Sequence, residues 1–96
     1  MDKTKEISQV LKALGHPDRL RLLCLLTEGE RTVTQLVDSC GVSQSQISQF
    51  LARMRAEGLV TAKRVGQSVS YRIARPEVKK LIRQLKNIFC DGGRDR

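Results

Sequence analysis

The sequence predicts a mainly α-helical domain of the α+β class that carries one β-hairpin. Two observations lead to this prediction. Apolar residues recur at helical spacing through most of the 96 residues, and two short β-favouring runs, 59–65 and 68–73, stand on either side of Gly66-Gln67. The length suits a single core, and chains this small often gain stability by dimerising. We expect one domain over residues 1–90 and a disordered tail over residues 91–96.

The first part of the chain predicts two helices. In the first, apolar side chains recur at helical spacing and Gly15 marks the end; these side chains are Ile7, Val10, Leu11 and Leu14. Pro17 suits the first position of the second helix, whose segment 20–26 is apolar on nearly every side. The second helix should therefore be buried.

A repeated capping motif predicts the next two helices. In Thr32-Val33-Thr34-Gln35 and Ser43-Gln44-Ser45-Gln46, a hydroxyl can accept from the N3 amide while the N3 glutamine reaches back to the cap. The helices should run over 33–40 and 44–57, followed by Gly41 and Gly58. Two short helices joined by a tight turn that contains glycine form a helix-turn-helix.

A hairpin and a last helix complete the predicted domain. Gly66 at the first of two loop positions suits a type II′ turn between the strands 59–65 and 68–73. Pro76 opens a final helix that should run to Cys90. One stripe of that helix is apolar, and it consists of Val78, Leu81, Ile82, Leu85, Ile88 and Phe89.

Positive charge is concentrated in the second half of the chain. The formal net charge is +8, and segment 53–86 holds ten Lys or Arg against Glu57 and Glu77, while the flanking segments balance to zero. This distribution favours a polyanion as partner, with a basic membrane-surface helix as the alternative. The longest apolar run, 22–26, is too short to span a membrane, and the N-terminus lacks the apolar segment of a signal peptide. We expect a cytoplasmic protein without a membrane partner.

The predicted helix 44–57 has a polar face that is rich in Ser and Gln. Its inward stripe consists of Ile47, Phe50, Leu51 and Met54, and its opposite face of Ser45, Ser48, Gln49 and Ala52. Ser and Gln can donate and accept hydrogen bonds at base edges, and a methyl group can meet thymine. Cations that can hold phosphates follow closely, and they are Arg53, Arg55, Lys63 and Arg64. The face predicts DNA binding, and a merely solvated helix face is the alternative.

These motifs together resemble a known family. HPDRLRLLCLL, VTQL, GVSQSQISQFLARMRAEGLV and KRVGQSVSYRI resemble the ArsR/SmtB winged helix-turn-helix repressors, over residues 7–90. The resemblance implies a homodimer, joined through the first and last helices, that binds a palindromic operator in double-stranded DNA. It implies base-facing side chains at Gln44, Ser45, Ser48 and Gln49, and wing positions at Arg64 and Gln67. The family often has His where this chain has Phe50, which we assign to the core.

The resemblance also implies an effector. One family metal site uses a Leu-Cys-Val-Cys-Asp-Leu pattern, where this chain has RTVTQL, and another uses His on the last helix, where residues 76–90 contain none. The only histidine, His16, precedes Pro17, where capping or exposure is expected. We therefore expect no metal and no other cofactor. Cys24 and Cys90 instead match the cysteine pair of the dithiol persulfide-sensing subgroup (SqrR/BigR/HlyU-like), which implies a small reactive sulfur species as effector.

The cysteine pair suggests how such a sensor could work. A disulfide needs Cα atoms about 4.4 to 6.8 Å apart, whereas each inserted sulfur lengthens the bridge, so a wider pair accepts a polysulfide. A bridge within one protomer or between two would tie the second helix to the last and release the DNA. Arg21 and Lys86 each precede a cysteine by one turn. A nearby cation lowers a thiol pKa, whereas apolar neighbours and a helix C-terminus raise it, and the sequence leaves this balance open.

Other interpretations stay open at this point. Cys24 lies among leucines and is also compatible with a structural thiol, Cys40 suits a buried filler, and Tyr71 suits packing of the hairpin. A metal- or metalloid-responsive repressor with a nonstandard thiolate site at Cys24 and Cys90 is a second function. A winged-helix protein-interaction module is a third, and a steep loss of binding with salt would favour DNA over it. We expect no enzyme, because no phosphate-binding glycine loop or catalytic set is present.

Overall fold

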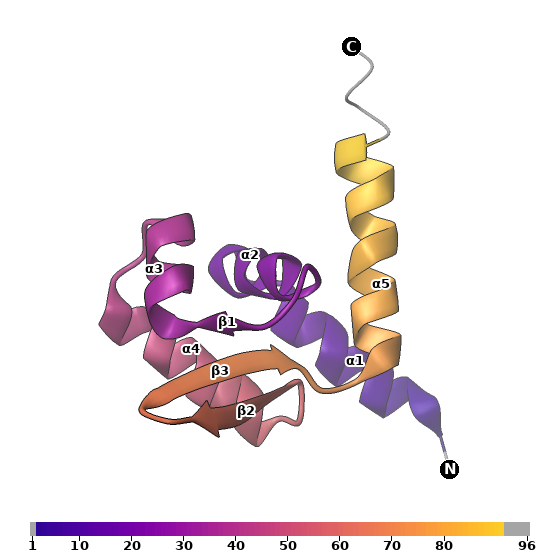
Figure 1. Ribbon diagram of the computed structural model, residues 1–96. Coiled ribbons are helices and arrows are strands. Elements are labelled where there is room, and N and C mark those ends of the chain that lie inside the picture. Colours follow the sequence, from indigo (N-terminus) through magenta and orange to yellow (C-terminus); the bar gives the residue numbers. More distant parts are fainter. Residues whose placement is uncertain (1, 92–96) are drawn as a thin grey trace.

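The computed structural model describes residues 2–91, and within them five α-helices and three strands form the predicted winged helix-turn-helix (Figure 1). In chain order the elements are α1 (Lys3–Leu14), α2 (Pro17–Leu26), β1 (Arg31–Thr32), α3 (Val33–Cys40), α4 (Gln44–Ala56), β2 (Val60–Val65), β3 (Ser68–Ile73), α5 (Pro76–Lys86) and the π-helical turn η1 (Asn87–Asp91). Helix α4 ends one residue before the predicted boundary. The tail predicted over 91–96 lies outside the described residues, apart from the backbone of Asp91.

Side-chain caps fix where the helices begin. Thr32 and Gln35 form the predicted capping box, because Thr32 Oγ1 accepts from the Gln35 amide at 3.2 Å and Gln35 Oε1 accepts from the Thr32 amide at 2.9 Å. At α4 only half of the predicted box forms within the described chain, where Ser43 Oγ accepts from the Gln46 amide at 3.2 Å. His16 caps α2, since its Nδ1 accepts from the Asp18 amide at 3.2 Å. The capping role predicted for His16 is confirmed.

The sheet is antiparallel in the order β1-β3-β2, with one strand more than the sequence predicted. Strand β1 contributes only Arg31 and Thr32, which pair with Tyr71 and Ser70 of β3. The hairpin turns at Gly66, whose φ of 63° is left-handed, and no non-glycine residue of the described chain has a positive φ. A type I′ turn needs positive φ at both central positions, so the turn is the predicted type II′.

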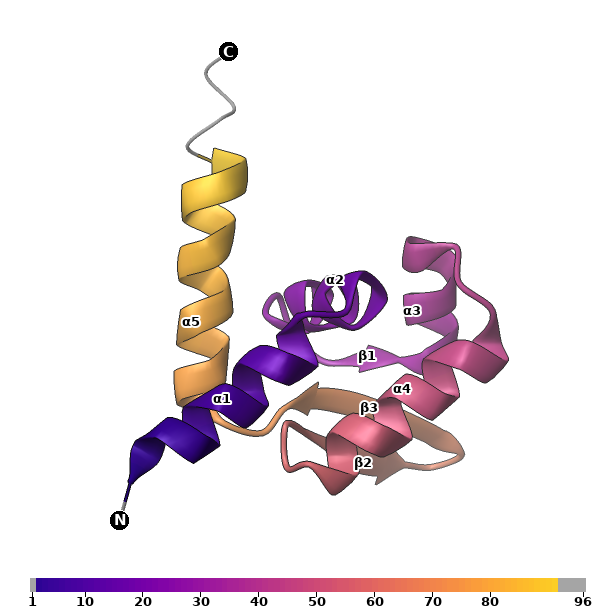
Figure 2. The same cartoon turned by 180° about the vertical axis from the view of Figure 1, so that it is seen from behind.

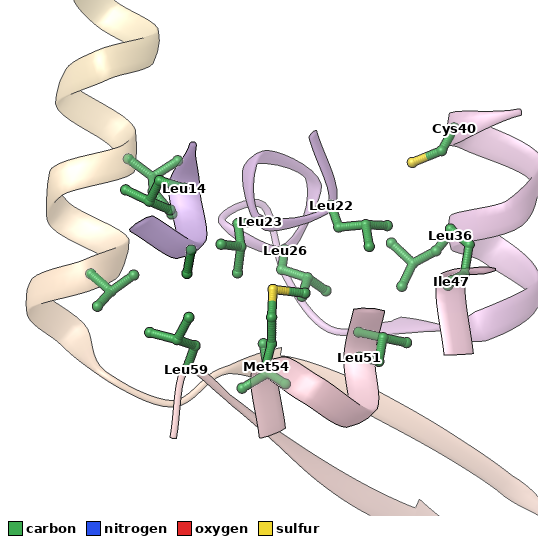
Figure 3. Close-up of a cluster of buried hydrophobic side chains, with 14 residues drawn as sticks. Leu14, Leu22, Leu23, Leu26, Leu36, Cys40, Ile47, Leu51, Met54 and Leu59 are labelled. Carbon is green, nitrogen blue, oxygen red and sulfur yellow. The ribbon is translucent and has the colours of Figure 1, made fainter. Parts of the chain in front are cut away.

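One apolar cluster joins the helices to the sheet (Figure 3). Its most buried members come from different elements: Leu23 of α2, Leu36 of α3, Leu51 of α4 and Ile82 of α5 have no exposed surface. Burying one such side chain contributes roughly 1.5 to 3 kcal/mol. The predicted burial of α2 is confirmed, and Cys40 lies at the edge of the cluster, as the filler that the sequence suggested.

The apolar stripe predicted for the last helix is divided between the core and the surface. Val78 and Ile82 are buried, whereas Ile88 and Phe89 are 63% and 76% exposed. Figure 2, like Figure 1, shows α1 crossing the first turns of α5, and α5 then rising clear of the sheet. None of the described helices is long and apolar enough to cross a membrane.

Candidate nucleic-acid interface and thiol site

The polar face of α4 is exposed and has no partner in the described part of the chain. Gln44, Ser45, Ser48 and Gln49 all lie on the surface with Ala52. The buried residues Ile47, Leu51 and Met54 occupy the other side of the helix. Within residues 2–91 none of the four polar side chains makes a hydrogen bond; only their backbone groups do, as part of α4. Their donors and acceptors are therefore free for an external partner such as a base edge.

Phe50 belongs to the inner side of α4, as the sequence predicted, although it is only half-buried. Its ring centroid lies 5.1 Å from that of His16, with the two planes 57° apart. It packs against the rim of the apolar cluster. Phe50 therefore links α4 to the start of α2 and leaves the exposed face to the Ser and Gln side chains.

The two arginines of α4 leave the helix on nearly opposite sides, because they are two residues apart. Arg53 is 72% exposed, and its Nε lies 3.6 Å from Oε2 of Glu57. An exposed ion pair of this kind contributes little, so a phosphate could replace the carboxylate. Arg55 is exposed on the other side. The helix thus carries a cation on each flank of its polar face.

In the wing, which is the hairpin of β2 and β3, two cations that are adjacent in sequence point to opposite faces of the sheet. Neighbouring residues of a strand point to opposite faces of the sheet, so Lys63 and Arg64 do too. Arg64 shares its face with Tyr71, which packs on the core as predicted, and Lys63 shares the outer face with Arg72. Arg72 Nε lies 3.4 Å from Thr61 Oγ1. Sequence reasoning missed Arg72, although cross-strand alternation could have identified it as a neighbour of Lys63.

Gln67 lies beside Gly66 in the turn of the hairpin, and it is exposed there. This is the wing position that the resemblance implied. The predicted interface residues therefore occupy two separate elements, α4 and the wing, and all of them are on the surface.

The two predicted sensing thiols lie on elements that adjoin where the end of α2 packs against the end of α5. Cys24 is half-buried on α2, and Cys90 is exposed in η1. Burial raises the pKa of the Cys24 thiol, the positive charge of Lys86 lowers it, and the charges of Cys90 and Glu28 raise it further.

The cations predicted beside these thiols have a different arrangement. Arg21, one turn before Cys24, instead extends to α3, where its Nη1 donates to the carbonyl oxygen of Cys40 at 3.4 Å. Burial raises the pKa of the Cys40 thiol, and the positive charge of Arg21 opposes this rise. Lys86, expected beside Cys90, acts on Cys24 across the helix contact. Lys86, and not Arg21, is therefore the cation that acts on Cys24, because tertiary packing as well as spacing along one helix determines the neighbours.

No three His, Cys, Asp or Glu side chains come together as a metal site among those that the structure describes. The only histidine caps α2 through Nδ1, and its ring packs on Phe50.

Comparison with known proteins identifies the family of the chain. The profile of the bacterial regulatory protein arsR family matches residues 16–62. The chain is 40% identical over 87 residues to the transcriptional regulator YgaV of Escherichia coli, covering 90% of this chain and 88% of YgaV. It is 38% identical over 81 residues to the transcriptional activator HlyU of Vibrio cholerae, covering 84% of this chain and 75% of HlyU.

Solved structures share the same fold. The transcriptional repressor BigR from Xylella fastidiosa superposes with a TM-score of 0.86 at 36% identity, covering 92% of this chain and 90% of BigR. The homodimeric winged helix-turn-helix DNA-binding domain of Mb0332 from Mycobacterium bovis gives 0.81 at 29% identity, covering all of this chain and 93% of that domain. The family profile covers the helix-turn-helix, and these similarities extend over the wing and α5. The chain belongs to the ArsR/SmtB family of DNA-binding transcriptional regulators.

Proposed function

We propose that the protein is a homodimeric repressor that releases its operator when reactive sulfur species modify Cys24 and Cys90. The proposal rests on the positions of the two thiols, because Cys24 lies on α2, which contacts α5, and Cys90 lies in η1, which continues α5. Helix α2 precedes the helix-turn-helix, and α5 together with η1 carries the exposed apolar residues Leu81, Ile88 and Phe89. A covalent link there connects the proposed DNA-binding half to the proposed dimer interface.

DNA recognition is assigned to α4 and the wing. The free Ser and Gln side chains of α4, Gln44, Ser45, Ser48 and Gln49, fit base edges in the major groove. Arg53, Lys63 and Arg64 fit phosphates, and Gln67 extends the contact at the tip of the wing. The net charge of +8 supports a polyanionic partner.

Dimerisation is assigned to α1 and α5. Ile7 and Leu11 of α1 are each 54% exposed, and together with Leu81 of α5 they line a groove of about 320 Å³ between the two helices. Contiguous exposed apolar surface marks interaction sites in small proteins. The homodimeric state of the similar Mb0332 domain supports a second copy as the occupant. Two protomers joined here would present two α4 helices to half-sites about 34 Å apart.

The proposed chemistry needs no oxidant beyond the persulfide. Each thiol loses its proton to water, and each thiolate attacks the outer sulfur of one glutathione persulfide, so that glutathione thiolate leaves. The Cys24 persulfide anion then attacks Sγ of the Cys90 persulfide. A sulfur–sulfur bond forms, HS⁻ leaves, and a trisulfide joins α2 to η1. We place the bridge within one protomer, because α2 contacts α5 there and η1 continues α5.

The test measures operator binding before and after sulfur transfer. Fluorescence anisotropy follows the reduced protein on a DNA fragment from upstream of its own gene, with and without glutathione persulfide. Wild type should bind when reduced and dissociate after treatment, with a trisulfide detected by intact mass. Cys24→Ser should stay bound, and Cys40→Ser is the matched control that should respond like wild type. Persistent binding of treated wild type, or unmodified thiols after treatment, would remove the proposal.

A further inference from the structure

Lys86 is held in one place by polar groups at the end of α2. Its Nζ lies 3.4 Å from Thr27 Oγ1 and 3.3 Å from Glu28 Oε2. The buried Thr27 hydroxyl in turn donates to the carbonyl oxygen of Cys24 at 2.6 Å. Arg83, one turn earlier on α5, donates to the Thr27 carbonyl oxygen at 3.3 Å. These bonds hold the ammonium group of Lys86 beside Thr27, which lies one turn after Cys24 on α2 and bonds to its carbonyl oxygen.

The surroundings of Cys24 make a neighbouring charge effective. A half-buried thiol is partly removed from water, which disfavours its ionised form. The Lys86 side chain is 29% exposed, so solvent screens its charge less than that of a fully exposed lysine. Burial raises the pKa of the Cys24 thiol above its ordinary value, the charge of Lys86 opposes this rise, and the charges of Cys90 and Glu28 add to it.

We propose that Lys86, held at the end of α2 by Thr27 and Glu28, is the positioning residue that favours the thiolate of Cys24, and that Glu28 weakens this effect. The thiolate, not the thiol, attacks sulfur and carbon electrophiles. Because Glu28 pairs with Lys86, its carboxylate partly offsets the positive charge that acts on the Cys24 thiol. Loss of the thiol proton then gives Lys86 a second anion to pair with. This inference rests on the proposed sensing role of Cys24, but it concerns the acidity of that thiol alone.

Two variants separate this role from a structural one. Lys86→Gln and Glu28→Gln both remove the ion pair between α2 and α5, so a purely structural effect would move them in the same direction. An electrostatic effect moves them in opposite directions, because one removes the cation and the other removes the anion that competes for it. Lys86→Arg keeps the positive charge and should restore wild-type behaviour.

The experiment measures alkylation of Cys24 by iodoacetamide, in which a carbon–sulfur bond forms and iodide leaves. Cys40→Ser and Cys90→Ser are present in every protein, so that Cys24 is the single thiol. Rates are followed by intact mass from about pH 6 to about pH 10, which spans ordinary thiol ionisation. Lys80→Gln, at an exposed position of α5, is the control for charge loss.

Lys86→Gln should move the pH profile to higher pH and slow alkylation at neutral pH about three- to tenfold, and Glu28→Gln should move it to lower pH. Lys86→Arg and Lys80→Gln should follow the parent. Shifts of the same sign in Lys86→Gln and Glu28→Gln, or a Lys86→Gln profile equal to the parent, would overturn the inference. The outcome is independent of DNA release, so opposite shifts without persulfide-induced release would reject the proposed sensor and keep the role of Lys86.

Discussion

Gln49 lies near the middle of the exposed face of α4, and its side-chain amide is free of partners within residues 2–91. An amide can make two hydrogen bonds to an adenine edge, so Gln49→Ala should cost about 1 to 3 kcal/mol in operator binding. Binding to a scrambled duplex should hardly change. Anisotropy titrations on both duplexes measure this, with Gln9→Ala, an exposed glutamine of α1, as control. Equal losses on the two duplexes would show that Gln49 does not read bases.

For single residues, the sequence predicted which side chains are exposed better than which side chains contact one another. The period of α4 was enough to put Ser45 and Gln49 on the surface, because the helix itself fixes which side chains share a face. The neighbours of Cys24 depend instead on how α5 packs against α2. Spacing pointed to Arg21, whereas packing supplies Lys86. A three-residue separation defines neighbours along one helix and says nothing about side chains that arrive from another.

Among the elements, the turn of the helix-turn-helix depends on one backbone conformation. Gly41 ends α3 with φ of 69°, and an added Cβ there would meet open space. Gly41→Ala should therefore cost about 1 to 2 kcal/mol in free energy of unfolding through backbone strain alone. Gly15 is the matched control, because its φ is −75° and an added Cβ makes only ordinary contacts. Urea unfolding at fixed protein concentration compares them, and equal effects would refute the argument.

An ion pair connects helix α1 to the segment between β3 and α5. Glu6 pairs with Lys3 and with Arg75, which lies between β3 and α5. Lys3, and then Arg75, lower the pKa of Glu6 below its ordinary value of 4.5. A carboxylate with a lowered pKa stabilises the fold above its unfolded pKa, and this contribution is lost as pH falls through the folded pKa. The ion pair between Glu6 and Arg75 should therefore weaken below pH 4.5.

Hydrogen exchange of the α1 amides measures this weakening, after correction for the intrinsic effect of pH. Protection in α1 should fall with pH in the wild type. Glu6→Gln should show reduced protection at neutral pH and little further change on acidification. Glu30→Gln, at an exposed position, is the control and should behave like wild type. Acid-independent protection of α1 in wild type would contradict the predicted weakening of the ion pair.

The elements differ in how far local sequence determines them. The capping residues and Gly66 act within a few residues, so the helix starts and the hairpin turn were predictable. Strand β1 was not, because Arg31 and Thr32 become a strand only by pairing with β3, which lies almost 40 residues further along the chain. Two residues are too few to show the alternation that predicts a strand.

For the whole molecule, the charge distribution predicted the kind of partner, but periodicity could not separate core from interface. Val78 and Ile88 lie on one predicted stripe, yet Val78 is buried and Ile88 is 63% exposed. An apolar stripe looks the same in sequence whether its own chain or a second copy covers it. Only the fold shows where the core ends, and it leaves apolar side chains of α1 and α5 uncovered.

Leu11, 54% exposed in the groove between α1 and α5, tests the proposed dimer. Leu11→Glu would bury a charge in the interface, so the variant should be monomeric by sedimentation velocity. A monomer reaches one half-site, so its operator affinity should fall strongly. Lys5→Gln, on the far side of α1, lowers the charge by the same one unit and should stay dimeric. A dimeric Leu11→Glu protein would place the interface elsewhere, and a monomer with undiminished operator affinity would separate dimerisation from DNA recognition.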